Sequence, residues 1–145
     1  MFNRTTQKLD FSGGTYGTVG TLNTSLFSGG LTVDVYGSLG ADSSSAWERF
    51  IDFGHAKGSS YADASYNIQM GRYSNTNRIQ IEIFNQTTGT TSSGLCASVA
   101  NQLDANFHRY TFVLSGTTCS LYVDGTQVNV INTATSATGL TIPYG

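Results

Sequence analysis

The sequence predicts an all-β fold, an antiparallel β-sandwich or jelly roll, from three observations. Apolar and polar residues alternate with a period of two in several segments, as in strands that bury one face. Clusters of Gly, Ser and Asn interrupt these segments roughly every eight to twelve residues. No stretch shows a sustained helical period with caps. About eight to ten strands in 145 residues are typical of a sandwich.

Five segments carry the clearest alternation, and each is expected to form a strand. They are Leu31–Tyr36, Tyr66–Met70, Arg78–Ile83, Tyr110–Leu114 and Leu121–Val123. In the first, Leu31, Val33 and Val35 share one face, and in the second Ile68 and Met70 point inward. The third predicts a half-buried strand with its isoleucines facing in and its polar groups facing out.

Turns are expected at glycine-containing positions between these strands. The positions are Gly71, Gly89, Gly94, Ser115–Gly116 and Asp124–Gly125. The last pair lies between the strand-like segments Cys119–Val123 and Gln127–Ile131, and it predicts a hairpin because both residues tolerate positive φ. With Pro143 as the only proline, no linker and no internal repeat, residues 1–145 are expected to form a single domain.

Charged residues make up only 11% of the chain, against about 25% in soluble domains. The polar surface must therefore come from hydroxyl and amide side chains, which are common on extracellular and cell-surface β-proteins. The net charge of −2 and the scattered arginines and lysines give little basis for nucleic-acid binding. No apolar segment approaches the roughly 20 residues that membrane insertion needs. The N-terminus has no apolar signal core, so we expect a removed signal or a fragment of a longer chain.

Cys96 and Cys119 fit one disulfide, although two buried free thiols stay open as the alternative. Asn3, Asn23 and Asn85 begin glycosylation sequons, which are compatible with secretion without establishing it.

Several of these segments follow one another in a recognisable order. They are Lys8–Gly14 with Tyr16 and Val19, Leu31–Tyr36, Arg49–Gly54, Phe107–Val113 and Leu121–Gly125. In this order they resemble the laminin-G-like domains of the concanavalin A-like lectin/glucanase superfamily, over roughly residues 8 to 132. Tyr36 and Phe107 stand where that family more often has tryptophan. The resemblance implies a jelly roll and an extracellular binding or adhesion role.

The end of the chain departs from that family. Its members continue with a glycine-containing strand and a closing strand, whereas this sequence stops at Ile142–Gly145. The resemblance thus implies that one or two strands are missing. We expect a fragment, or a subunit whose edge beside Lys8–Ser12 is completed by a neighbouring chain. A shortened, self-sufficient domain stays open.

The sequence offers little for catalysis. Retaining glycoside hydrolysis needs two carboxyl groups about 5 Å apart. Glu48 and Glu82 lie on different predicted strands, and Asp34, Asp52 and Asp124 are isolated in sequence. No Gly-x-Ser-x-Gly elbow occurs. We therefore expect a protein that is not an enzyme.

Histidines and loop acids have mostly structural interpretations. His108 is expected to be hydrogen-bonded at a sheet end, and His55 to be solvated in a loop. Relatives in the resembled family bind calcium through loop oxygens, and Asp42 and Asp63 are the candidates here. Because solvated loop acids are the usual case, no cofactor is expected beyond that possible Ca²⁺.

Aromatic residues in or beside polar loops are the candidates for ligand contact. They are Trp47, Tyr61, Tyr66 and Tyr73. Trp47 is the best single stacking platform, and its alternative is a core tryptophan at one end of the sandwich. We expect a non-catalytic extracellular module that binds a carbohydrate or a protein. The alternative is a structural subunit of a surface layer, fibre, filament or virion that assembles through sheet edges.

Overall fold

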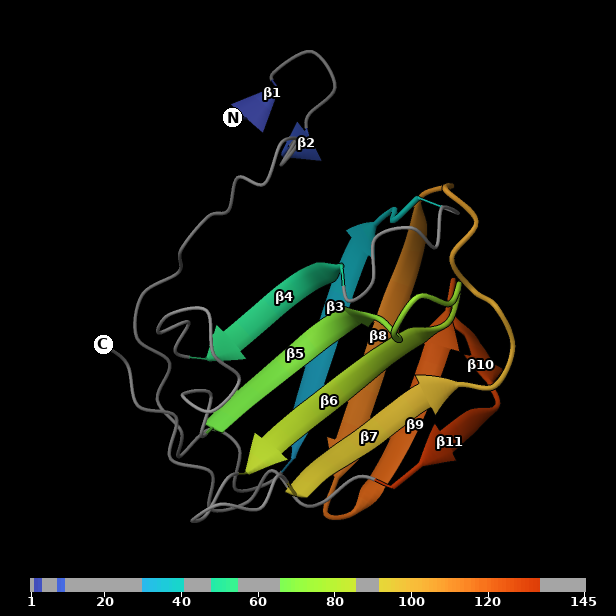
Figure 1. Cartoon of the computed structure of the whole chain (residues 1–145). Helices are drawn as coiled ribbons and strands as arrows, with labels where there is room; N and C mark the ends of the chain where they lie inside the picture. The colour runs from blue at the N-terminus through green and yellow to red at the C-terminus, as the bar shows by residue number, and fades with distance from the viewer. Residues whose placement is uncertain are drawn as a thin grey trace.

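The computed structural model of the chain describes Phe2–Asn3, Lys8–Leu9 and residues 30–40, 48–54, 66–85 and 92–133. Every regular element in these ranges is a strand, and none of them holds a helix able to cross a membrane. Strands β1 (Phe2–Asn3) and β2 (Lys8–Leu9) pair with each other in a separate two-stranded sheet. The remaining strands form two antiparallel sheets that pack face to face (Figure 1). The prediction of an all-β fold with two antiparallel sheets is confirmed.

The first large sheet has four strands. Its order is β10 (Thr126–Val128), β9 (Thr118–Val123), β8 (His108–Ser115) and β3 (Leu31–Gly37). The second sheet has five strands, in the order β11 (Val130–Asn132), β7 (Ser92–Ser98), β6 (Ile79–Asn85), β5 (Tyr66–Arg72) and β4 (Arg49–Gly54). Strands β4 to β7 form a meander, whereas β3 pairs with the distant β8.

The core lies between the two sheets and is built from the inward positions of the alternating segments. The five-stranded sheet supplies Ile68, Met70, Ile79, Ile81 and Ile83, and the four-stranded sheet supplies Val33, Tyr110, Phe112, Leu114 and Leu121. Leu31 and Val35 pack against this cluster, so the predicted apolar face of the first segment is confirmed. Burying one such side chain stabilises the fold by about 1.5–3 kcal/mol.

The hairpin predicted at Asp124–Gly125 is confirmed. Both residues have positive φ, 50° and 80°, and Thr126 pairs with Val123 across the turn. The strand predicted at Gln127–Ile131 is wrong as a single element, because it splits at Asn129 between β10 and β11. The Asn129 carbonyl accepts a hydrogen bond from the Val99 amide at 2.9 Å, which directs the chain toward β7. The chain thereby passes from one sheet to the other and joins them at this side.

Two glycines predicted at turns lie inside strands instead, Gly71 in β5 and Gly94 in β7. A Cβ atom at Gly71 would lie 2.0 Å from the carbonyl oxygen of Glu48. The missing side chain lets the start of β4 approach closely, where the Arg72 amide donates to that oxygen at 2.7 Å. The register between β4 and β5 shifts beside this contact, between Arg49 and Ile51.

Three polar residues at the centre of β5 and β6 are buried, contrary to the prediction of outward polar groups for the third segment. Gln69, Gln80 and Glu82 alternate with the inward isoleucines and Met70, yet each is buried. Gln69 Nε2 donates to Glu82 Oε2 at 2.8 Å, and Gln80 Nε2 lies 3.4 Å from the same oxygen. These two amide donors partly compensate for the free energy that is lost when the Glu82 carboxylate is removed from water. The outer face of this sheet is therefore buried and polar at its centre.

The predicted disulfide is present between Cys96 and Cys119. Cys96 lies in β7 and Cys119 in β9, so the bond links the two sheets directly. Both side chains are buried, and they lie near the side where β10 and β11 join the sheets. The disulfide and the strand crossing constrain the same side of the sandwich.

Replacing Cys96 and Cys119 together by alanine is expected to lower the free energy of unfolding by about 3 kcal/mol, because the bond restricts the unfolded chain. Urea unfolding of the oxidised protein and the variant measures this difference. Reductant should lower the free energy of unfolding of the wild type by a similar amount and leave that of the variant unchanged. A wild type that is indifferent to reductant would contradict the role assigned to the bond.

Candidate functional site

Most residues predicted to bind a ligand or a metal lie outside the described residues. These are Trp47, Tyr61, Asp42 and Asp63, together with Asn23 of the second sequon and the loop residue His55. Tyr66, Asn3 and Asn85 belong to strands β5, β1 and β6, where only their backbone is described. Their proposed roles stay predictions.

Tyr73 follows β5, and its ring packs against Arg78. The Arg78 guanidinium carbon lies 4.7 Å from the ring centroid, which is a cation–π contact. The Tyr73 carbonyl accepts from the Thr76 hydroxyl at 2.5 Å, which fixes the turn before β6. One face of this ring is therefore occupied within the protein itself.

Two exposed aromatic rings lie together at one end of the four-stranded sheet. Tyr36 in β3 is 71% exposed, and Phe107, directly before β8, is 45% exposed. Their ring centroids are 5.6 Å apart with planes tilted by 38°. Exposed apolar groups that gather in this way often mark a binding surface. We call Tyr36 and Phe107 the aromatic pair.

An ion pair lies beside the aromatic pair on the same outer face. Arg109, which is opposite Tyr36 in the β3–β8 register, holds Asp34 through two nitrogens, with Nη2 at 2.6 Å and Nε at 3.0 Å. The Thr111 hydroxyl donates to Asp34 at 2.7 Å. These hydrogen bonds, that of Arg109 first, keep the pKa of Asp34 below its usual range. The fork geometry fixes the plane of the guanidinium of Arg109, the residue opposite Tyr36 in the register.

His108 bridges two carboxylates at this end of the sheet. Its Nδ1 lies 2.6 Å from Asp124 Oδ2, and its Nε2 lies 3.0 Å from Asp104 Oδ1. The hydrogen bond with Asp124 is the main cause that raises the pKa of His108. The backbone amide of Arg109 lowers the pKa of Asp124, and that of Asn106 lowers the pKa of Asp104. The hydrogen bonds expected for His108 at a sheet end are present.

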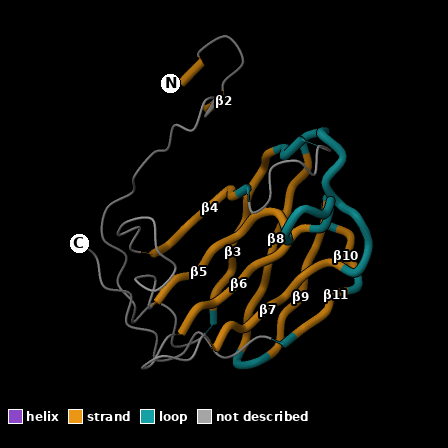
Figure 2. Tube along the Cα trace, viewed as in Figure 1, coloured by secondary structure: helices purple, strands orange, loops and turns teal. Residues whose placement is uncertain are grey.

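Residues 99–107, between β7 and β8, carry Asp104 and Phe107 and are anchored in the core. The Tyr110 hydroxyl donates to the carbonyl of Gln102 at 3.0 Å, and burial raises the pKa of Tyr110 to about 12. The amides of Gln102 and Leu103 both donate to the carbonyl of Asn77, at 2.8 and 2.9 Å. Figure 2 shows these connecting segments gathered beside one another.

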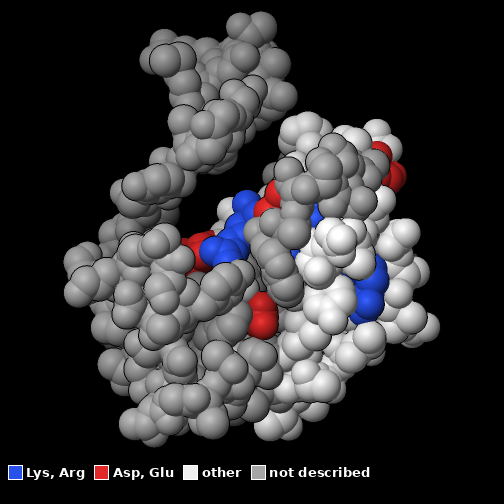
Figure 3. All heavy atoms as spheres, in the orientation of Figure 1, with Lys and Arg blue, Asp and Glu red and all other residues white. Residues whose placement is uncertain are grey.

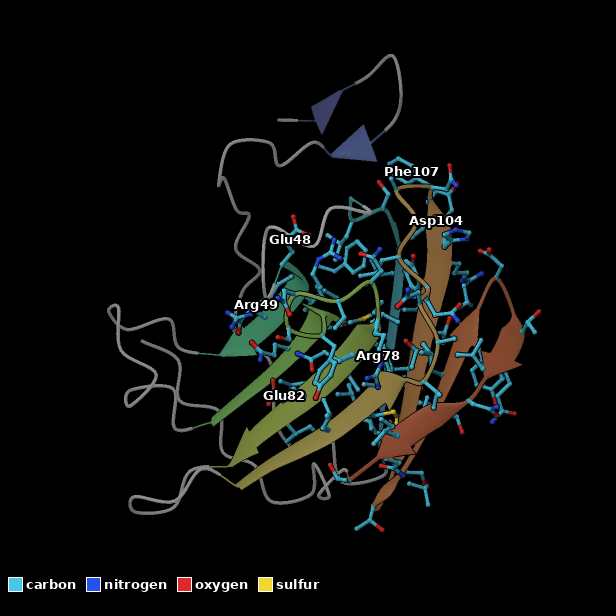
Figure 4. The ribbon with its side chains drawn as sticks, turned by 45° about the vertical axis from the view of Figure 1, so that its right-hand side comes forward. Glu48, Arg49, Arg78, Glu82, Asp104 and Phe107 are labelled. Carbon is cyan, nitrogen blue, oxygen red and sulfur yellow. A yellow bond between two sulfur atoms is a disulfide. The ribbon has the colours of Figure 1, made fainter. Side chains whose placement is uncertain are left out.

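Arg72 holds Asn77 and the neighbouring segments together from a fully buried position. Its guanidinium donates to Glu48 at 2.9 and 2.8 Å, to Asn77 Oδ1 and the Thr76 carbonyl at 2.8 Å each, and to the carbonyl of Gly40. The cation thus joins the residue before β4, the segment after β3 and the β5–β6 turn. In Figure 4, Glu48 lies near the start of β4, and Phe107 and Asp104 near the start of β8.

Charge on the described surface occurs in small local groups. Figure 3 shows, on the face in view, separate blue and red clusters among the described residues and no continuous stripe. At the candidate site, on the other sheet, the paired charges are Asp34 with Arg109, and His108 with Asp104 and Asp124.

No family model matches the chain, and no curated protein or solved structure matches it.

Sequence reasoning did not select the aromatic pair, although a signal was present. Tyr36 lies on the polar side of an alternating segment, after Thr32 and Asp34. An aromatic residue on that side predicts an exposed ring. Phe107 gave no comparable signal, because its position depends on the loop that precedes β8.

Replacing Arg72 by methionine is expected to lower the free energy of unfolding by about 3 kcal/mol, because Glu48 and several backbone carbonyls lose a buried donor. The exposed Arg49–Asp52 pair provides a matched control, since Arg49→Met should cost less than about 1 kcal/mol. Urea unfolding of both variants measures the difference. Equal effects of the two substitutions would contradict the role of Arg72.

Proposed function

We propose that this protein is a non-catalytic extracellular binding module and that its ligand is a carbohydrate. The observation that carries the proposal is the contact between Tyr36 and Phe107, two exposed aromatic rings on a strand-supported surface. A pyranose presents C–H groups that pack on an aromatic face and hydroxyls around its rim. Asp34, Thr111 and Arg109 offer acceptors and donors at the edge of that face.

The charge of the surface favours an uncharged sugar over a polyanion. Three carboxylates, Asp34, Asp104 and Asp124, face two cations, Arg109 and protonated His108. Both cations are already paired with carboxylates, so neither is available as an unpaired anion site. A neutral ligand that adds ring packing and hydroxyl hydrogen bonds fits these properties best.

The interactions of the acids support a non-catalytic role. Each described carboxylate accepts a hydrogen bond from a side chain of the protein. The pairs are Asp34 with Arg109, Glu48 with Arg72, Asp52 with Arg49, Glu82 with Gln69, and Asp104 and Asp124 with His108. A hydrolytic acid–base pair needs two carboxyl groups directed at one substrate bond.

The disulfide and the low charge support an extracellular location, because disulfides persist in oxidising compartments. The resemblance to laminin-G-like jelly rolls supports the same role. Calcium at Asp42 and Asp63 is an additional expectation of that resemblance.

A glycan array followed by titration calorimetry tests the proposal. Tyr36→Ala and Phe107→Ala should each weaken binding of the best wild-type glycan by at least about tenfold, as expected for a central aromatic contact. Ile131→Ala is the matched control, because Ile131 is 44% exposed on the other sheet, and its affinity should stay unchanged.

Trp47→Ala belongs in the same experiment. A loss of binding in Trp47→Ala alone would move the site away from the aromatic pair. Absence of any glycan hit, with capture of a protein partner, would replace the carbohydrate by a protein ligand.

Assembly through sheet edges is the second candidate function. Strands β3 and β4 end their sheets, and among the described strands each has one hydrogen-bonded neighbour. Such edges can pair with another chain. Light scattering over a range of concentrations distinguishes the two functions. Growth in mass that Tyr36→Ala does not affect would favour assembly, and a monomer at every concentration would argue against it.

A further inference from the structure

Both ring nitrogens of His108 lie within hydrogen-bonding distance of carboxylate oxygens, at 2.6 Å and 3.0 Å. A neutral imidazole carries one N–H, whereas the imidazolium carries two. Because ionised carboxylates only accept hydrogen bonds, the observed geometry requires the protonated ring. When the ring loses a proton, one ring nitrogen becomes an acceptor that faces a carboxylate oxygen, which also only accepts. One of the two contacts must then break.

The two carboxylates are held with different strength. Asp124 also accepts from the Arg109 backbone amide at 2.9 Å, which ties the β9–β10 turn to β8 independently of His108. Among the described residues, Asp104 accepts only from Asn106 besides His108, and Asn106 belongs to the same loop. The Nε2–Asp104 contact is therefore the one that opens when the ring is neutral.

The segment that this contact restrains carries part of the candidate site. Residues 104–107 end with Phe107. Ala105 within them has a φ of 70°, a conformation that L residues rarely adopt. A restrained, strained segment relaxes when its restraint is lost. Phe107 ends this segment, and its ring lies 5.6 Å from that of Tyr36 between centroids.

The other groups around His108 do not replace this restraint. Tyr110 presents its ring at 5.9 Å between centroids, and Arg109 is engaged by Asp34. On the neighbouring strand β3, the residue opposite His108 is the uncharged Gly37.

We propose that His108 is a proton-dependent clamp that holds residues 104–107, and with them the aromatic pair, so that ligand binding weakens as pH rises. The effect on ligand binding rests on the proposed function, whereas the pH dependence of the His108 contacts and of the ring contact does not.

The direction in which the clamp responds to pH follows from the direction of the pKa shifts. The hydrogen bond with Asp124, followed by that with Asp104, raises the pKa of His108 in the folded protein. The stabilisation by the clamp is thus fully present below the unfolded pKa of about 6.5 and is lost as pH rises through the folded value. The pKa values of Asp104 and Asp124 are lowered, so both stay ionised across this window.

NMR of the ligand-free protein between pH 5 and 9 tests the clamp. We expect the nuclear Overhauser effect between the Tyr36 and Phe107 rings to decrease with the midpoint of the His108 titration. The protection factor of the Asn106 amide, which corrects for base-catalysed exchange, should fall with the same midpoint. His55→Gln, which alters the other histidine, is the matched control and should leave both transitions in place. A ring contact that stays constant while His108 titrates would overturn the proposal.

Asp104→Asn separates the clamp from a general effect of pH. An amide can donate to the neutral ring or accept from the charged one, so this variant should keep the ring contact across the whole range. His108→Gln should remove the transition entirely. Retention of the wild-type transition in either variant would assign it to another group.

Titration with the best glycan from the array, at pH 6 and pH 9, tests the consequence. Affinity should fall at least about tenfold in the wild type, the size of one charge-assisted contact, and stay constant in Asp104→Asn. Rings that separate without any change in affinity would refute the regulation of binding and move the ligand elsewhere. Absence of glycan binding at both pH values would refute the proposed function, while the NMR result would still decide the clamp.

Discussion

The guanidinium of Arg72 is the interaction on which one end of the molecule depends. A fully buried cation is stable only when acceptors surround it, and here these acceptors come from Glu48, Gly40 and the turn at Thr76 and Asn77. The segments after β3 and before β4, together with the β5–β6 turn, must therefore converge. The close approach of Glu48 in turn requires the absence of a side chain at Gly71. A local backbone requirement and a buried charge thus enforce the same arrangement.

This arrangement extends to the candidate site through Asn77. Its side chain accepts from Arg72, while its carbonyl accepts the amides of Gln102 and Leu103 in the following loop. The same loop is held from the core by the Tyr110 hydroxyl. The aromatic pair is consequently supported by buried hydrogen bonds on one side and by the His108 contacts on the other. Only the second support is exposed and titratable, which is why a proton can act there without affecting the core.

The sequence predicted the features that alternation and turn chemistry encode. The inward faces of β3, β5 and β6, the Asp124–Gly125 turn and the pairing of Cys96 with Cys119 are confirmed. The division of β10 from β11 could not be predicted, because the chain changes sheets at Asn129 without losing its extended pattern. The role of Gly71 depends on a strand more than twenty residues away in sequence. The burial of Gln80 and Glu82 likewise depends on packing that periodicity does not describe. At the candidate site, the position of Tyr36 on the polar face of its strand predicts an exposed ring. Its contact with Phe107 could not be predicted, because the fold brings the two residues together.

The chain has few charges, and most of the described ones are used in ion pairs, whereas Arg78 packs on Tyr73 and Glu82 accepts from Gln69. Arg72, Arg109 and His108 each neutralise a carboxylate, and each pair joins segments that are distant in sequence. Such pairs position backbone and rings and leave little net field on the surface. In the proposed function, recognition at the aromatic pair comes from ring packing and short hydrogen bonds, whose strength depends on how rigidly the rings are held. In the proposed function, the order of residues 99–107 controls binding affinity at this surface, and the proposed clamp places the Asp104–His108 contact where that order can be changed.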